Sequence, residues 1–394
     1  MNLADELRAL DRLAPVLDAL PGPAYLVGGT VRDLLLGRPS EFDFDLAVTG
    51  DAESFARELG KRLGGRVTLH GRFGTAVVQY GDRAHVDIAT TRVETYAAPA
   101  ALPYVAPAPL IEQDLRRRDF TINAMAIELP RGELIDPHNG REHLRHELVR
   151  VLHERSFEDD PTRIFRAARY EARLRFRMDP KTETLALIAV PQVALLSGAR
   201  VREELYAIFA EDRAERALTR LHELGVDGAL GMHFVPPKGL LARLHEVNER
   251  YALGLPPWHL GLLAIDAPPG KLDELKVQGR AAQGVEAAHR EAEDLRSRLA
   301  DATSGAEIVA AIEATGPDTP LYALALDDLR ALRDYFQRLR AVRLEIDGDD
   351  LAALGLVESP RVGEVLAELR RRKLNGQLDG RAAELAAARE LLAE

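Results

Sequence analysis

The sequence predicts an α+β fold, in which a small mixed β-sheet with helices is followed by an all-helical remainder. Short strand-like runs alternate with helical segments up to about residue 140. Beyond that point strand signals nearly vanish, and helical periodicity continues to residue 394. A chain of 394 residues is too long for one ordinary hydrophobic core, so we expect two to four domains.

The N-terminal elements follow from apolar spacing and from glycine and proline. Leucines at helical spacing predict the first helix, and Pro21-Gly22-Pro23 ends it. A run rich in alanine and proline (PAALPYVAPAP) is typical of a loop. The expected elements are, in order, a helix over 1–20, a short strand before Gly28, a helix over 31–36, a strand over 42–48, a helix over 52–63, strands over 67–69, 75–80 and 85–90, and a loop over 99–109.

The composition excludes several classes of protein. The chain has no cysteine, which rules out disulfides, thiolate zinc sites and cysteine nucleophiles and is typical of a cytoplasmic protein. It has no run of about 18 uncharged apolar residues, and its acidic N-terminal segment does not resemble a signal peptide, so we expect no membrane association. The net charge of −11 is unusual for a nucleic-acid binder, but residues 163–177 carry six arginines, and 116–118 and 370–373 are further basic clusters.

Two short motifs place candidate phosphate and metal ligands close together. Gly28 and Gly29 follow an apolar run, and without a Cβ the backbone there can approach a polyphosphate. Asp43 and Asp45 share one face of the expected strand, as ligands of a divalent cation would. Asp87 supplies a third carboxylate if its strand is a neighbour. Each feature alone also fits a plain turn or solvated carboxylates, but together they favour a Mg²⁺ site that presents a nucleoside triphosphate to an attacking hydroxyl.

Residues 116–126 (RRRDFTINAMA) offer ligands for the phosphates and the sugar of a nucleotide. The guanidinium groups of its arginines present planar donors to phosphate oxygens. Asp119 and Asn123 can hydrogen-bond a ribose hydroxyl, whereas the apolar residues among them would bury the segment. An ordinary helix start after a charged loop is the alternative interpretation.

GGTVRDLLLG, FDFD and RRRDFTINAMA, in this order and spacing, resemble the signature of the class II (bacterial-type) tRNA nucleotidyltransferase and poly(A) polymerase family. The resemblance covers about residues 22–225 and implies a nucleotidyltransferase head followed by a helical neck, body and tail. It implies a template-independent enzyme that adds CMP and/or AMP, from CTP and ATP, to the 3′ end of tRNA by two-metal phosphoryl transfer with Mg²⁺, releasing pyrophosphate. The implied residues are Asp43, Asp45 and Asp87 in catalysis, the first two as metal ligands; Gly28, Gly29, Arg32, Arg117, Arg118 and Arg166 at the triphosphate; and Asp119 and Asn123 at the ribose.

Residues 158–163 (EDDPTR) resemble the family's amino-acid template for the incoming base, usually Glu-Asp-x-x-Arg. The resemblance implies Asp159, Asp160 and Arg163 as template residues, with Asp159 standing where the family has glutamate. Arg163 can donate to O2 and N3 of cytosine, or to N1 of adenine, while Asp160 accepts from the exocyclic amine. Uracil and guanine carry a carbonyl at that position and would be rejected. Asp160 before Pro161 is also a good helix N-cap, and the two roles are compatible.

The resemblance divides the chain into a head (1–140), a neck with the base template (141–200), a body (201–275), and a tail (276–394) that would bind the acceptor and TΨC region of tRNA. Split-function members of the family add only CC or only A. The long loop between Arg92 and Leu115 favours A addition, because CC-adding relatives lack a flexible loop there. Poly(A) polymerase is the next alternative, and a non-catalytic RNA-binding protein that kept the head fold is the last.

Overall fold

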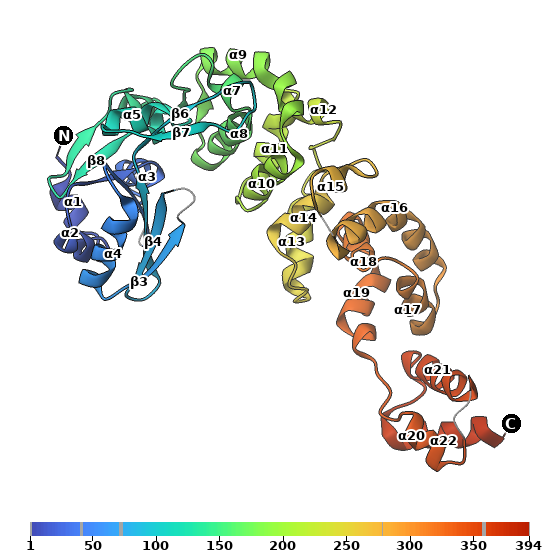
Figure 1. The fold of residues 1–394 in the computed structure, drawn as a ribbon. Coiled ribbons are helices and arrows are strands. Elements are labelled where there is room, and N and C mark those ends of the chain that lie inside the picture. The colour runs from blue at the N-terminus through green and yellow to red at the C-terminus, as the bar shows by residue number, and fades with distance from the viewer. Residues whose placement is uncertain (1, 40–41, 71–73, 278, 357–359, 394) are drawn as a thin grey trace. The chain divides into compact units, whose positions relative to one another are not determined.

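The computed structural model describes residues 2–39, 42–70, 74–277, 279–356 and 360–393 (Figure 1). The chain forms two compact units, one made of Met1–Glu204 with Glu211–Leu230 and the other of Leu205–Ala210 with Gly231–Glu394. The first unit holds the large β-sheet, and the second is helical. Among the described residues, no helix combines the length and the apolar character needed to cross a membrane.

A mixed seven-stranded sheet forms the centre of the first unit, which confirms the predicted α+β class. Its strand order is β3-β4-β5-β2-β1-β8-β9. The pair β2–β5 is parallel, and the other neighbouring pairs are antiparallel. The strands are β1 (Ala24–Val27), β2 (Asp43–Val48), β3 (Arg66–His70), β4 (Thr75–Tyr80), β5 (Ala84–Thr90), β8 (Ala126–Leu129) and β9 (Glu133–Ile135).

The pairing of β2 with β5 sets carboxylates side by side. Asp45 is in register with Asp87, and Asp43 is in register with His85. Phe44, on the opposite face of β2, is fully buried. Because side chains alternate between the two faces of a strand, the burial of Phe44 turns both aspartates toward the other face. The prediction that the strand of Asp87 lies beside that of Asp43 and Asp45 is therefore confirmed.

Two helices connect the first strands of the sheet. Helix α3 (Gly29–Leu35) follows β1 directly, and α4 (Ala52–Leu63), which has the predicted bounds, packs against β4. The side chain of Asp51 accepts a hydrogen bond from the Glu53 N–H at 3.0 Å and so caps the start of α4. Gly64, with a φ of 63°, adopts the left-handed conformation that ends the helix.

The single N-terminal helix predicted from the leucine spacing is wrong. The structure has two short helices, α1 (Ala4–Arg8) and α2 (Ala14–Ala19), separated by turns. Pro15 has no N–H to donate within a continuous helix, and it is tolerated in the first turn of α2. The carbonyl of Arg12 accepts a hydrogen bond from the Tyr80 hydroxyl at 2.6 Å, so it serves the sheet rather than a helix.

The alanine- and proline-rich segment is not wholly a loop, which corrects the prediction. Tyr104–Pro107 form β7, which pairs antiparallel with β6 (Arg92–Thr95) in a separate two-stranded ribbon. At the base of the ribbon, the Ala108 N–H donates to the Thr91 carbonyl at 2.8 Å, and the Thr91 hydroxyl donates to the Ala108 carbonyl at 2.7 Å. These contacts between distant residues close the ribbon, and the loop is confined to 96–103.

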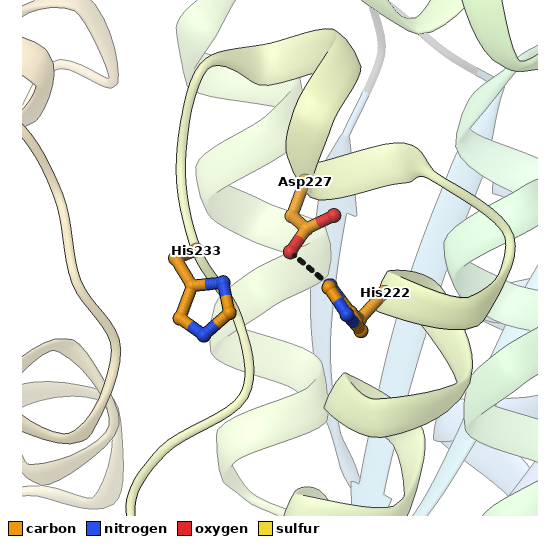
Figure 2. A group of neighbouring side chains, drawn as sticks. All are labelled: His222, Asp227 and His233. Atoms are coloured by element: carbon orange, nitrogen blue, oxygen red, sulfur yellow. Dashed lines mark hydrogen bonds and ion pairs between the residues drawn. The ribbon is translucent and has the colours of Figure 1, made fainter.

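The rest of the first unit is mainly helical. Figure 2 shows His222, near the end of α11, facing Asp227 of the next helix, and His222 Nδ1 lies 2.8 Å from Asp227 Oδ2. This contact links two consecutive helices. The helices are α5 (Ile111–Arg116), the 3₁₀ helix η2 (Thr121–Asn123), α6 (Gly140–Arg145), α7 (Ser156–Asp159), α8 (Thr162–Leu174), α9 (Pro180–Ala189), η3 (Val190–Leu195), α11 (Ala214–Glu223) and α12 (Val226–Leu230), with a small parallel pair β10 (Leu148–Val149) and β11 (Arg177–Met178). Helix α10 (Gly198–Phe209) begins in the first unit, and its residues from Leu205 onward belong to the second.

The second unit is helical, as the sequence predicts. Its long central helix α16 packs against α18, and a separate core around Leu351, Leu369 and Ala388 joins the last three helices. The helices are α13 (Leu240–Arg250), α14 (Pro257–Ala264), α15 (Lys271–Glu274), α16 (Arg280–Asp301), α17 (Gly305–Glu313), α18 (Thr319–Leu326), α19 (Arg330–Gln337), η4 (Leu339–Ala341), α20 (Gly348–Ala353), α21 (Pro360–Leu374) and α22 (Gly380–Ala393).

The basic cluster at 370–373 lies in the last turns of α21 and is matched by acidic neighbours. The ion pairs are Arg370 with Glu313, Arg371 and Arg372 with Glu368, and Lys373 with Glu384 and Glu345. In this arrangement the cluster offers little unbalanced positive charge to a phosphate backbone.

Candidate active site

One cleft in the first unit gathers nearly all the residues predicted for the site. Its volume is about 1030 Å³. The predicted residues that line it are Gly28, Gly29, Arg32, Asp43, Asp45, Asp87, Arg117, Arg118, Asp119, Asn123, Asp160, Arg163 and Arg166. Asp159 is not among the lining residues that the structure describes, and its carboxylate instead lies 3.5 Å from the Arg155 guanidinium.

Three carboxylates stand on neighbouring strands in this cleft. Asp43 and Asp45 come from β2, and Asp87 comes from β5. One potential ligand atom from each of Asp43, His85 and Asp87 lies within 4.8 Å of the other two, and His85 Nε2 is 3.2 Å from Asp43 Oδ1. No sequence motif identifies His85, although its spacing of two residues from Asp87 on a strand is a signal that could have placed both on one face.

The three carboxylates lie close enough to repel one another. Burial raises the pKa of Asp45, and the neighbouring charges of Asp43 and Asp87 raise it further. Burial also raises the pKa of Asp87. A divalent cation would relieve both effects, and carboxylate oxygens are the ligands that hard cations prefer. The donors present therefore fit a divalent metal ion.

Arg117 and Arg118 are both held by one buried carboxylate, that of Asp114. Its Oδ1 accepts from Arg117 Nε at 3.0 Å and Nη2 at 2.8 Å, and its Oδ2 accepts from Arg118 Nη2 at 3.0 Å. The backbone N–H of Arg92 donates to Oδ1 at 3.1 Å. Although burial acts in the opposite direction, the charges of Arg118 and Arg117 lower the pKa of Asp114. A spacing of three and four residues to the two arginines is the sequence signal that identifies Asp114.

Arg118 lies against the glycine turn after β1. A Cβ at Gly28 would stand 2.8 Å from Arg118 Nη1, and Gly28 has a φ of 71°. Both the close approach and the left-handed backbone favour glycine at this position. The backbone turn and the guanidinium thus converge on the cleft from two separate segments.

Asp119 and Asn123 are joined to two arginines in a buried network. Asp119 Oδ2 accepts from Arg166 Nε at 2.8 Å and Nη2 at 2.6 Å, and Asp119 Oδ1 accepts from Asn123 Nδ2 at 2.9 Å. Asn123 Oδ1 accepts from Arg32 Nη1 at 2.7 Å, and Arg32 also pairs with Asp33 at 2.8 Å. The residues expected at the ribose and two of those expected at the triphosphate therefore hold one another in place.

The network is balanced in charge and packed against an aromatic ring. Burial alone would raise the pKa of Asp119, but the Arg166 charge and the hydrogen bonds lower it. Burial alone would lower the pKa of Arg166, but the Asp119 carboxylate raises it. Three guanidinium groups, from Arg32, Arg166 and Arg169, lie 5.3–5.8 Å from the centre of the Tyr170 ring, within cation–π range.

The two template residues that line the cleft are Asp160, in the short connection between α7 and α8, and Arg163, in the first turn of α8. Arg163 Nη1 donates to Ser156 Oγ at 2.7 Å, and Arg163 Nη2 donates to the Arg117 carbonyl at 2.8 Å. Asp160 Oδ1 accepts from the Thr162 N–H at 3.0 Å. The N-cap residue of α8 is Pro161 rather than Asp160, which corrects the prediction. Asp160 nevertheless satisfies the first N–H of the helix from the preceding position, and it also lines the cleft.

Glu94, Tyr96 and Glu204 also line the cleft, although none of them was predicted as a site residue. Glu94 pairs with Arg117 at 3.1 Å. Burial, helped by the Glu94 charge, raises the pKa of Tyr96 to about 12, and burial also raises the pKa of Glu204. Glu94 comes from β6, Tyr96 from the loop that joins β6 to β7, and Glu204 from α10. Their positions depend on tertiary contacts that the sequence does not reveal.

Comparison with known proteins matches the chain to two protein families. Residues 24–150 match the family described as Poly A polymerase head domain. Residues 175–227 match the family described as Probable RNA and SrmB- binding site of polymerase A. The first match contains all seven strands of the main sheet, from β1 to β9. It also contains the carboxylates and arginines of the cleft up to Asn123.

Individual proteins resemble the chain over nearly its full length. An A-adding tRNA nucleotidyltransferase from Halalkalibacterium halodurans is 32% identical over 98% of this chain and 92% of the relative. An A-adding tRNA nucleotidyltransferase from Geobacter sulfurreducens is 35% identical over 93% of this chain, but the chain spans only 44% of that relative's length. A solved CCA-adding enzyme in an apo form has a TM-score of 0.82 and 30% identity, over 99% of this chain and 95% of that one.

Proposed function

The chain belongs to the tRNA nucleotidyltransferase and poly(A) polymerase family, and we propose that it transfers a nucleotide from a nucleoside triphosphate to the 3′ end of tRNA. One observation carries the proposal: Asp43, Asp45 and Asp87 share a cleft with Arg117 and Arg118. Carboxylates bind cations, and arginines bind phosphate oxygens. A single cleft therefore offers both parts of a site for a metal-bound triphosphate. Membership of the family indicates RNA as the acceptor.

Different residues of the cleft are proposed to have different roles in the transfer of the nucleotide. The 3′-hydroxyl of the RNA attacks the α-phosphorus, the bond to the bridging oxygen breaks, and pyrophosphate leaves. We propose Mg²⁺ as the ion held by Asp43 and Asp45, where it would lower the pKa of the attacking hydroxyl and neutralise the leaving group. Arg118 binds triphosphate oxygens, and Asp119 and Asn123 hold the ribose in position.

Asp160 and Arg163 are proposed to select a base that carries an exocyclic amine. A carboxylate accepts from the amine of adenine or cytosine and repels the carbonyl of guanine or uracil. AMP is the favoured nucleotide, because both relatives described above, which match over 90% of this chain, are A-adding enzymes. Complete CCA addition is the second candidate, favoured by the CCA-adding enzyme whose fold matches over 99% of the chain.

We further propose that residues 1–140 form the catalytic head and 141–200 the neck, with a body (201–275) and a tail (276–394) that contact tRNA. The basic cluster at 370–373 is paired with acidic residues. We therefore propose that the shape of the tRNA, rather than this cluster, is the main basis for its recognition. We propose the cytoplasm as the compartment, because a chain without cysteine cannot form the disulfides that are typical of proteins in oxidising compartments.

Incorporation into three tRNA transcripts tests the function. The transcripts end before CCA, after C, and after CC, and each is offered labelled ATP or CTP with Mg²⁺. AMP addition to the CC-ending transcript alone is the expected result. Addition of C, C and A across the set would instead identify a complete CCA-adding enzyme. Long A tails on any 3′ end would favour a poly(A) polymerase, and no incorporation would contradict the enzymatic proposal.

Asp114→Asn is expected to weaken nucleotide binding more than it slows the chemical step. The asparagine amide lacks the negative charge that holds Arg117 and Arg118, and its NH₂ group cannot accept a hydrogen bond from either arginine. The KM for the nucleoside triphosphate should rise roughly tenfold, with a smaller change in kcat. Glu112→Gln, an exposed change on the same helix, is the matched control. A KM equal to that of the control in steady-state assays would exclude a positioning role for Asp114.

A further inference from the structure

Every hydrogen bond that the structure gives the Asp160 side chain ends on the same oxygen. Oδ1 accepts from the Thr162 N–H at 3.0 Å, from Thr162 Oγ1 at 2.7 Å and from Arg200 Nη2 at 2.7 Å. Three donors saturate a carboxylate oxygen. Among the hydrogen bonds of the described residues, none ends on Oδ2, and Asp160 lines the cleft. A ligand in the cleft would therefore meet Oδ2.

Arg200 reaches this carboxylate from the first turn of α10 and has a second anchor. Its Nη1 donates to the Ala100 carbonyl at 3.0 Å. Ala100 lies in the loop of the β6–β7 ribbon with a φ of 60°, a left-handed conformation that residues other than glycine rarely adopt. The Ala100 N–H donates to the Glu158 carbonyl at 3.4 Å. Contacts on both sides of Ala100 thus hold a strained peptide in place, and one guanidinium joins it to Asp160.

We propose that Arg200 is a positioning residue that fixes which oxygen of Asp160 meets the incoming base, with the backbone at Ala100 as its second anchor. The inference rests on the proposed function, because it concerns how that site selects a base. Arg200 is not among the cleft-lining residues that the structure describes, so it acts through Asp160.

The physical effect is on selectivity rather than on affinity alone. With Oδ1 saturated, one acceptor in one orientation faces the base, and an amine can donate to it while a carbonyl is repelled. A carboxylate without Arg200 could rotate about its χ2 bond and present either oxygen, or a bridging water, to the base. A base with a carbonyl would then be tolerated. The bond to Ala100 limits the movement of the guanidinium itself, so it contributes to the same selectivity.

Equilibrium binding of ATP, CTP, GTP and UTP to the full chain tests the proposal without requiring transfer. The wild type should bind ATP or CTP more tightly than GTP or UTP. Arg200→Gln should reduce that ratio roughly tenfold, mainly by strengthening the relative binding of GTP and UTP. Arg200→Lys keeps the charge but cannot make both hydrogen bonds. Its preference for ATP or CTP over GTP or UTP should therefore lie between that of the wild type and that of Arg200→Gln. Arg202→Gln, on the same helix and paired with Glu203 at 2.7 Å, is the control.

Two substitutions at Ala100 test the second anchor without altering Arg200 or Asp160. Ala100→Pro forces φ to about −65° and removes the N–H, so it should lower the base ratio as Arg200→Gln does. Ala100→Gly accepts the left-handed conformation and keeps the carbonyl, so its ratio should equal that of the wild type.

Three results would overturn the inference: an equal loss of affinity for all four nucleotides in Arg200→Gln, an unchanged ratio in that variant, or a wild type without base preference. The first of these is what a purely structural role for Arg200 predicts. Failure of the proposed function is a different observation, namely a wild type that binds with base preference but incorporates nothing into the tRNA transcripts.

Discussion

Asp45→Asn is expected to reduce nucleotide incorporation at least roughly a thousandfold while the protein stays folded. Asparagine has nearly the same shape, but it lacks the negative charge that would help to hold a divalent cation between β2 and β5. Single-turnover incorporation into the CC-ending transcript measures the loss, and circular dichroism checks the fold. Asp82→Asn, an exposed change in the turn between β4 and β5, is the matched control. Activity within tenfold of that control would exclude Asp45 as a metal ligand.

The same substitution is expected to stabilise the protein when no metal is present. Burial and the charges of Asp43 and Asp87 raise the pKa of Asp45 above its reference value of 3.8. As pH rises through that value, the unfolded chain releases its proton first, so the wild type loses stability until folded Asp45 has also ionised. At neutral pH in EDTA, the thermal midpoint of Asp45→Asn should therefore exceed that of the wild type. Added Mg²⁺ should raise the wild-type midpoint more than that of the variant, and a lower midpoint in EDTA would contradict the electrostatic argument.

Local patterns were enough to predict five of the seven strands of the main sheet, but β8 and β9 were not predicted. The strands and α4 follow from alternation and amphipathic spacing, which depend on neighbours in the sequence. The N-terminal helix and the β6–β7 ribbon were mispredicted because distant contacts decide them. The Tyr80 hydroxyl takes the Arg12 carbonyl out of a helix, and Thr91 closes the ribbon through Ala108. In each contact the two partners lie far apart along the chain, 68 residues for Arg12 and Tyr80 and 17 residues for Thr91 and Ala108.

For the candidate site, the sequence predicts residue types better than partners. The period of a strand is enough to bring Asp43 and Asp45 to one face, and pairing adds Asp87. Arg32 and Arg166 were expected at the triphosphate, and they line the cleft, but their hydrogen bonds go to Asn123 and Asp119, 91 and 47 residues away. The sequence motifs do not reveal these pairs, because the two partners of each pair lie in different motifs that are far apart along the chain.

Asp119→Ala is expected to lower the free energy of unfolding by about 3 kcal/mol. Breaking a buried ion pair by removing one partner leaves the other charge without compensation, and this typically costs about 3–5 kcal/mol. We take the lower end because the Arg166 side chain is 34% exposed and can recover part of its hydration, whereas Asp119 is 7% exposed. The loss also leaves the Asn123 amide without its acceptor. Urea denaturation of the wild type and the variant at neutral pH measures the difference.

The pH dependence and two further variants separate this charge effect from simple loss of packing. The pKa of Asp119 is lowered in the fold, so its contribution is complete above the reference value of 3.8 and is lost as pH falls through the lower folded value. The difference between Asp119→Ala and the wild type should therefore shrink in acid. Adding Arg166→Met to Asp119→Ala should recover part of the stability, because the uncompensated charge is gone. Glu154→Ala, which breaks the exposed pair with Lys181, should leave the free energy of unfolding almost unchanged. A loss of stability that does not depend on pH, and that Arg166→Met makes larger, would mean that Asp119 stabilises the fold by shape rather than by charge.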